Sequence, residues 1–242
     1  MKVGPQPSGL LTRRKILSAS AKAFLQHGYA GTSSKMVAQL AGVTNGSPFY
    51  LYGNKEGVLL ELVKQVFSYQ FEAVEQALGA NPDPVLLCAT ETALQLHIAE
   101  ISEPLRELYI TAYTLPSTAH YINERMAKKV QDLLSAYLME GTADDIYESE
   151  LACFGVMRSF MAAPCTAAFP MERKVRRFLS CCFRIHGIPE EVYAPVIEQV
   201  IARDLTPLAR MIVEKTVLQT EEDYETAMAD TVHAKKERGA NR

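Results

Sequence analysis

The chain has 242 residues, of which 48% are hydrophobic and 22% charged, and its formal net charge is −3. This length and composition are ordinary for a globular protein of one or two domains with a substantial core. No apolar run approaches the roughly 18 residues of a membrane span, and the N-terminus lacks the apolar core of a secretory signal, so we expect a cytoplasmic protein with no membrane partner.

The charges are distributed unevenly along the chain. The first 55 residues contain seven of the 25 basic residues and none of the 28 acidic ones, and Glu56 is the first acid. The rest of the chain carries 18 bases against 28 acids, a net charge of −10. A basic head on an acidic body predicts binding to a polyanion, because neutralising phosphates supplies most of the non-specific affinity for nucleic acid.

The basic head is predicted to hold three helices. Residues 1–11 are expected to form a flexible arm, before a first helix that Thr12 caps and Gly28 ends. Thr32 or Ser33 should cap a second helix, which ends at Gly42. Its side chains Met36, Val37, Leu40 and Ala41 are expected to point inward. A third helix should begin at Asn45, which is favoured over Thr44 because it places Pro48 in the first turn, and should end at Gly53.

The remaining residues are predicted to form a helical body. Asn54 should cap a long helix that connects head and body, and NPDP at 81–84 supplies a loop, a cap and a first-turn proline. Further helices are expected up to about residue 101 and over 103–115, 118–140, 144–169, 172–186 and onward from Pro189. Residues after Gln219 form a charged tail, either frayed or a solvent-exposed helix.

These patterns together predict an all-α fold of nine or ten helices. The expected divisions are the arm at 1–11, a helix-turn-helix head at 12–54, a larger ligand-binding and dimerisation domain at 55–218, and the tail at 219–242. We find no convincing strand pattern and no internal repeat.

The five cysteines do not point to a metal site or to catalysis. Their odd number, without a secretory signal, indicates reduced thiols, and no pair has the spacing of a common zinc motif. Cys181-Cys182 lies in an apolar helical pattern, so core packing is favoured over redox or metal chemistry. His186 would share a helix face with Cys182, but no third group completes a nucleophile and base. The sequence therefore predicts no catalytic residue, metal or cofactor.

The segment AQLAGVTNGS carries the most specific motif. A glycine permits the sharp turn between the two helices of a helix-turn-helix, and small or polar residues then open the helix that enters the major groove. Residues 12–62 also contain Phe24, Gly28-Tyr29, Thr32-Ser33, VAQLAGVT at 37–44, Gly46-Ser47, Phe49, and Asn54-Lys55-Glu56 with Leu59. With these residues at this spacing, the chain resembles the TetR family of bacterial regulators.

The resemblance and the helix-turn-helix geometry imply a set of DNA contacts. A helix N-terminus near Thr32 suits a phosphate, although a simple capping role is an equal alternative there. The start of the third helix should meet base edges, and the lysines should contact phosphates. Phe49 stands where the family usually has tyrosine, so either Phe49 packs inside and Tyr50 alone faces DNA, or both contribute. The candidate residues are Thr32, Ser33, Ser34, Lys35, Thr44, Asn45, Gly46, Ser47, Phe49, Tyr50 and Lys55.

The resemblance also implies a homodimer on a palindromic double-stranded DNA operator, and a repressor that a small molecule releases. We expect the dimer surface on the helix predicted over 144–169 and on the last predicted helix, after Pro189. The candidate residues there are Phe154, Met157, Arg158, Met161, Val196, Val200, Leu205, Leu208 and Ile212. An apolar or aromatic effector is expected from the soft lining of the candidate pocket, although His97 is more readily a core histidine. The candidate effector residues are His97, Tyr109, Tyr113, Met126, Cys153, Met157 and Phe160.

Two other classes of protein remain open at this point. One is an all-helical interaction module whose basic head binds an acidic protein. The other, less favoured, is an enzyme that uses a thiol or a histidine.

Overall fold

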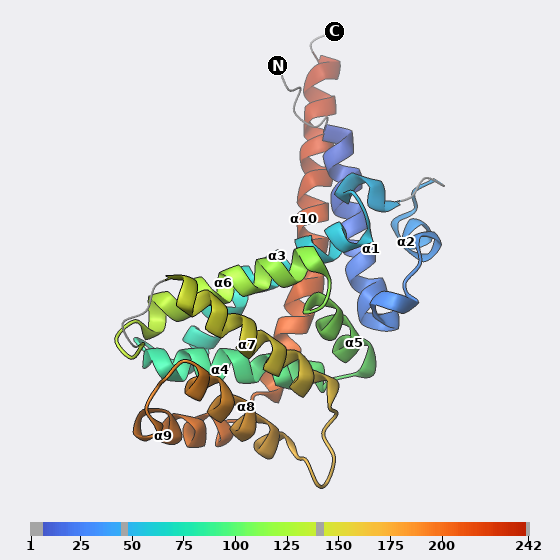
Figure 1. Ribbon diagram of the computed structural model, residues 1–242. Helices are drawn as coiled ribbons and strands as arrows, with labels where there is room; N and C mark the ends of the chain where they lie inside the picture. Colours follow the sequence, from blue (N-terminus) through green and yellow to red (C-terminus); the bar gives the residue numbers. More distant parts are fainter. Residues whose placement is uncertain (1–6, 45–47, 139–142, 241–242) are drawn as a thin grey trace.

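The computed structural model describes residues 7–44, 48–138 and 143–240. Within these ranges the fold is all-α, as the sequence predicted, and the only β feature is an isolated bridge between Thr166 and Phe169 (Figure 1). No helix in these ranges combines the length and the apolar character needed to cross a membrane. The helices are α1 (Pro7–Gly31), α2 (Ser34–Ala41), the 3₁₀ helix η1 (Pro48–Tyr52), α3 (Lys55–Leu78), α4 (Pro84–Ala99), α5 (Glu103–Ala112), α6 (Pro116–Leu134), α7 (Ala143–Ala162), α8 (Met171–Ile185), α9 (Glu190–Ile201) and α10 (Thr206–Ala240).

Side-chain caps fix four helix starts. Ser33, Asn54, Asp83 and Ser102 each accept a hydrogen bond from a backbone N–H three residues later, at 3.2, 2.8, 2.9 and 3.3 Å. Each cap satisfies one of the N–H groups that a helix start leaves without an intrahelical partner. The predicted cap at Asn54, the cap within NPDP at Asp83, and Ser33 as one of two alternatives are confirmed.

The first and third helices differ from prediction. Helix α1 begins at Pro7, so residues 7–11 are helical and not part of an arm. The chain leaves helical geometry at Gly28, where φ is 70°, and resumes a turn that runs to Gly31. Only the short 3₁₀ helix Pro48–Tyr52 is present in the second half of the predicted third helix, and its predicted start at 45–47 lies outside the described residues.

Several helices of the body end earlier than predicted, and α6 stops at Leu134, not near residue 140. Helix α7 stops at Ala162, not near residue 169, because Pro164 has no N–H to continue the ladder and disfavours helical geometry in the residue before it. The predicted tenth helix is divided in two: α9 ends at Ile201 and α10 starts at Thr206, whose N–H donates to Asp204 at 3.0 Å.

The C-terminal helix packs on the head. Helix α10 continues without a break past residue 219, where the sequence predicted a separate tail, and runs antiparallel beside α1 (Figure 1). Arg14 donates to the carbonyl oxygen of Asp223 at 2.7 Å, and Lys22 forms an ion pair with Glu221. The basic head is therefore partly neutralised by acids of the same chain.

The residues expected at the dimer surface mostly lie inside the protomer. Met157 and Met161 of α7 are buried against the body's own helices, and so are Val196, Val200, Leu205 and Ile212. Phe154 and Leu208 are half-buried, and Arg158 is exposed. The prediction was wrong for the buried side chains because an apolar helical stripe has the same pattern whether it faces the core or a partner.

Candidate nucleic-acid interface and cavities

The helix-turn-helix is built on the small inner face of α2. Val37, Ala38 and Ala41 are buried, and Gly42 ends the helix in the left-handed conformation, with φ of 57°. The N–H of Val43 donates to the carbonyl of Ala38 at 3.0 Å, a pattern typical of glycine-terminated helices. This glycine turn confirms the predicted boundary between the two helices.

One apolar residue of α2 lies on the opposite face from the one expected. Leu40 was predicted to point inward, but its side chain is 53% exposed. The eight residues of α2 make little more than two turns, so only a narrow stripe can face the core.

Some of the predicted DNA-contact residues are buried, and others are exposed. Phe49 is only 5% exposed and belongs to the head's core, whereas its neighbour Tyr50 is 71% exposed. Thr32 is buried as well, and its hydroxyl donates to the carbonyl of Gly28 at 2.7 Å. Phe49 and the Thr32 side chain are therefore removed from the contact set, in agreement with the alternative that only Tyr50 faces DNA. The exposed members of the set are Ser33, Ser34, Lys35, Thr44 and Tyr50, while Asn45, Gly46 and Ser47 lie outside the described residues.

Lys55 has a role inside the head that the sequence did not suggest. Its ammonium donates to the carbonyl oxygens of Tyr29 and Thr32, the second at 2.6 Å, and lies 4.2 Å from the centre of the Tyr29 ring. Burial lowers its pKa, against an opposing effect of Glu107. Lys55 thus ties the start of α3 to the turn before α2, and a phosphate contact from it is not favoured by this geometry.

Arg13 and Tyr52 join η1 to α1. The Tyr52 hydroxyl donates to the carbonyl of Arg13 at 2.7 Å, and the Arg13 guanidinium stacks 4.5 Å from the centre of the Tyr52 ring. Burial raises the pKa of Tyr52 to about 12. Arg13 therefore helps to position the helix that carries Tyr50.

The body holds the head through two carboxylates. Glu107 of α5 accepts hydrogen bonds from the N–H groups of Tyr29 and Ala30, just beyond the break at Gly28. Glu56, in the first turn of α3, accepts from the N–H of Ser117 at the start of α6, at 2.8 Å. Both contacts connect the head to helices that also line the cavities of the body.

A first cavity, of about 70 Å³, lies between head and body. It is bounded by α1, α3, α4, α5, α6 and α10, and its lining is almost entirely apolar. This volume exceeds the roughly 10–15 Å³ that one water needs. Of the predicted effector residues, Tyr109 and Tyr113 line it, together with Phe24 and Leu25 of the head.

A second cavity, of about 50 Å³, lies deeper in the body between α4, α6, α7 and α8. Four predicted effector residues line it: Tyr113, Met126, Cys153 and Met157. Two others lie outside both cavities. His97 lines a separate hollow beside Asp204, and Phe160 packs against Phe169 and Phe178. The predicted set was therefore drawn from four places and does not form one pocket.

A chain of buried polar groups crosses the wall between the two cavities. Gln70 of α3 and Gln95 of α4 donate to the same oxygen of Glu91, at 2.5 and 2.9 Å, and the Tyr113 hydroxyl donates to Gln95 at 2.6 Å. Burial raises the pKa of Glu91 to about 8, so this carboxyl is mainly protonated at neutral pH. This network was not predicted, because its members are polar residues inside apolar helices.

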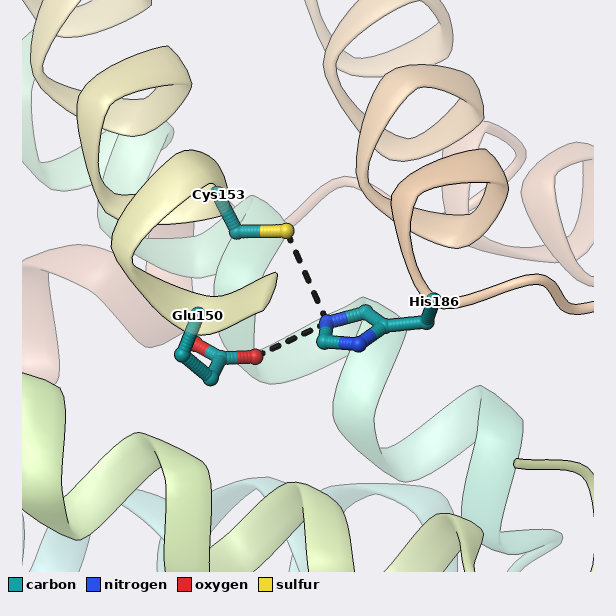
Figure 2. Close-up of side chains that lie close together, drawn as sticks. All are labelled: Glu150, Cys153 and His186. Atoms are coloured by element: carbon teal, nitrogen blue, oxygen red, sulfur yellow. Dashed lines mark hydrogen bonds and ion pairs between the residues drawn. The ribbon is translucent and has the colours of Figure 1, made fainter. Parts of the chain in front are cut away.

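His186 also lies beside groups that the sequence did not connect with it. Its Nε2 is 2.9 Å from a carboxylate oxygen of Glu150 and 3.5 Å from the sulfur of Cys153, both on α7 (Figure 2). Burial alone would lower the pKa of His186, but its hydrogen bonds to Cys153 and Glu150 outweigh that effect and raise it to about 9. Cys181, expected in the core, is instead exposed.

Comparison with known proteins agrees with the geometry of the head. Residues 16–62 match the family described as bacterial regulatory proteins, tetR family. The chain is 30% identical over 128 residues to the HTH-type transcriptional regulator LmrA of Bacillus subtilis (strain 168), which covers 42% of this chain and 65% of LmrA. It is 27% identical over 73 residues to the HTH-type transcriptional repressor AcnR of Corynebacterium glutamicum, covering 30% of this chain and 38% of AcnR.

The whole fold has a solved counterpart as well. The crystal structure of RolR in complex with resorcinol superimposes with a TM-score of 0.60 over 81% of this chain and 96% of RolR. At 14% sequence identity this likeness concerns the fold alone. The head, residues 16–62, therefore matches the tetR family of bacterial regulatory proteins, and the chain as a whole shares its all-α fold with RolR.

Proposed function

We propose that this protein is a ligand-responsive, DNA-binding transcriptional repressor that binds a palindromic operator as a homodimer. The observation that carries the proposal is the exposed face of an acid-free helix-turn-helix. Ser33, Ser34 and Lys35 at the start of α2, with Thr44 and Tyr50 beyond the glycine turn, offer hydroxyl and ammonium donors to a phosphate backbone. The relatives LmrA and AcnR, named as a regulator and a repressor, support the same reading.

The homodimer follows from the size of the head. One helix-turn-helix offers few base contacts, and two heads related by a two-fold axis would read half-sites about one helical turn apart. The outward face of α7 supports this arrangement, because Arg158 is exposed and Leu151 is 50% exposed on the same helix as the buried Met157. We place the partner protomer on this outward face of α7.

The first cavity is the proposed effector site. It is the cavity that touches head and body together, since Phe24 and Leu25 of α1 line it beside α3, α5 and α10. An apolar or aromatic molecule fits this lining, with Gln70, Gln95 and Thr216 as polar anchors. Occupying it would displace α5, which carries Glu107, and thereby change the hold on the head. A ligand releases DNA in this scheme only if it binds the released conformer more tightly.

Operator binding is tested by fluorescence anisotropy on the DNA that flanks the protein's own gene. We expect two chains per duplex and an affinity at least about 1,000-fold above that for random DNA of equal length at moderate salt. Equal affinity for both duplexes would contradict the operator, and binding to an acidic protein instead would favour the interaction module.

Replacing Lys35 with alanine should weaken binding to every duplex and lower the slope of log K against log salt by about one, because one phosphate contact is lost. The matched control is Lys128→Ala, which removes an equally exposed lysine from α6, where its ammonium pairs with Asp132. If both variants keep the slope of the unchanged protein, Lys35 does not contact phosphate.

Replacing Glu107 with alanine should loosen the head without unfolding the body. The N–H groups of Tyr29 and Ala30 lose their acceptor, which costs about 1–3 kcal/mol locally. Hydrogen exchange at these two amides should then accelerate about tenfold or more. Glu103→Ala, on the exposed side of α5, is the control and should leave both amides unchanged. Equal exchange rates in the two variants would show that Glu107 does not hold the head.

A further inference from the structure

Glu150, Cys153 and His186 form a compact cluster of three different metal-binding groups. One carboxylate oxygen, one sulfur and one imidazole nitrogen all lie within 4.8 Å of one another (Figure 2). All three residues are buried, and the site contains a hydrogen bond or ion pair between His186 and each of the other two. The second cavity opens beside them and is lined by all three.

Two neighbouring helices bring the cluster together. Glu150 and Cys153 are one turn apart on α7, and His186 directly follows the last residue of α8. Residues three or four positions apart on a helix share a face, so one helix supplies two donors and its neighbour the third. The sequence predicted no metal site because common zinc motifs are recognised by cysteines and histidines that lie close together in the chain. Here Cys153 and His186 are 33 residues apart.

The two donor separations that involve His186 are close to those around a small tetrahedral ion, and the sulfur and the Glu150 oxygen lie within 4.8 Å of each other. Zinc–sulfur and zinc–nitrogen bonds of about 2.3 and 2.0–2.1 Å place sulfur and nitrogen about 3.5 Å apart across a tetrahedron. The distance from Cys153 Sγ to His186 Nε2 is 3.5 Å. The Glu150 oxygen, at 2.9 Å from the same nitrogen, needs to move back by about half an ångström to reach the tetrahedral separation. The ring's Nδ1 has no hydrogen-bond partner among the described residues, so no such bond opposes a small adjustment of the ring.

The chemistry of the donors selects the ion. A thiolate and an imidazole favour zinc over magnesium or calcium, which prefer oxygen ligands. A thiolate, a carboxylate and a neutral imidazole carry two negative charges, and a divalent cation neutralises them in a place where unpaired charge is costly. The other buried carboxyl described above, Glu91, has two amides as its partners.

We propose that Glu150, Cys153 and His186 bind one zinc ion between α7 and α8, with the fourth coordination position facing the second cavity. Cys182 also lines that cavity. The ion would fix the spacing of the two helices in the body. The proposal does not depend on DNA binding, and it assigns to this cluster a ligand different from the apolar effector of the first cavity.

Cobalt substitution tests the proposal on the full-length protein. The chelator-treated protein is titrated with Co²⁺ alone, whose visible bands report tetrahedral coordination and whose near-ultraviolet band reports a cobalt–thiolate bond. We expect one Co²⁺ per chain with both sets of bands, and loss of both when one equivalent of Zn²⁺ is added. Zinc should also raise the melting temperature of the unchanged protein, because a ligand that binds only the folded state stabilises it.

Two variants and one control separate the cluster from other thiols. Cys153→Ser should remove the cobalt–thiolate band and weaken zinc binding by more than about 100-fold. A residue that only hydrogen-bonds to a metal ligand would cost less zinc affinity than this. Cys181→Ser changes an exposed thiol on α8 and should keep the band. If Cys153→Ser does not fold, Glu150→Gln keeps the thiol and should weaken zinc binding while retaining the cobalt–thiolate band. The proposal fails if the unchanged protein takes up no cobalt or zinc at micromolar concentration, or if Cys181→Ser removes the band and Cys153→Ser does not.

Discussion

Replacing Gly57 with alanine should destabilise the protein by about 2–4 kcal/mol and weaken operator binding by at least tenfold. Gly57 lies in the first turn of α3, where its N–H donates to the capping Asn54 at 2.8 Å. A Cβ atom there would lie 3.1 Å from the carbonyl carbon of Tyr52 and far inside contact distance of its oxygen. That obstacle is backbone, so either η1 or the first turn of α3 has to move.

The expected loss of DNA binding has a structural cause of its own. Helix η1 carries the exposed Tyr50, and its position is set by Tyr52, whose hydroxyl binds α1. A shift of the Tyr52 peptide would therefore misplace Tyr50 even in molecules that remain folded.

Denaturant unfolding and anisotropy, both on the same preparation, measure the two effects. The control is Gly155→Ala in α7, where a Cβ meets nothing within 4 Å. That change should stabilise the protein slightly, because alanine is favoured over glycine within a helix by about 0.5–1 kcal/mol. Equal stability of the two variants would mean that the junction between η1 and α3 tolerates a side chain.

Replacing Glu91 with glutamine should stabilise the protein at pH 8 by on the order of 3 kcal/mol and have little effect near pH 4.5. Burial raises the folded-state pKa of Glu91 to about 8 from its ordinary value of 4.5. As pH rises through this window, the unfolded chain loses the Glu91 proton before the folded chain does. The unchanged protein therefore loses stability between about pH 4.5 and 8, at up to about 1.4 kcal/mol per pH unit, and levels off above that range.

Glutamine is the appropriate replacement because it resembles the protonated acid. It keeps an oxygen that can accept from Gln70 and Gln95, and it does not titrate. The measurement is the free energy of unfolding of the variant and of the unchanged protein as a function of pH. Subtracting the second from the first cancels the contributions of the other titratable groups. Glu75→Gln, which removes an exposed carboxylate of α3, should give a difference that hardly changes with pH. A flat difference for Glu91→Gln as well would place its folded-state pKa near the ordinary value.

Together the two experiments examine the two ends of the proposed regulatory path. Gly57 lies where the connecting helix α3 begins, beside the DNA-facing residues. Glu91 lies further along, where Gln70 of the same helix is hydrogen-bonded to the wall between the cavities. The proposed repressor mechanism needs a rigid α3 that transmits displacement between these ends.

Much of the fold was predictable because its signals are local. A cap such as Asn54 acts on an N–H three residues away, and Gly42 ends its helix through its own φ angle. The family pattern of the head also lies within about 50 consecutive residues. Where local signals were missing or misread, as at Pro164, the predicted helix end was wrong.

The candidate sites were less predictable because they depend on side-chain direction. Lys55 and Lys35 look alike in sequence, yet one binds carbonyls inside the head and the other is exposed. Phe49 and Tyr50 are adjacent, and only packing against the first helix decides which is buried. The effector residues were chosen as soft apolar side chains, a description that fits any position in a helical core.

The sequence by itself determined the all-α class, the helix-turn-helix head with its acid-free charge, and the family that this head matches. Each follows from interactions between residues a few positions apart or from composition, which no tertiary contact alters. The tertiary structure decided how α10 supports the head, which cavity touches both domains, and how Glu150, Cys153 and His186 meet. These depend on contacts between segments 30 to more than 200 residues apart, such as Arg14 with Asp223. Chain folding brings such segments together through the packing of whole helices, and no short stretch of sequence records that packing.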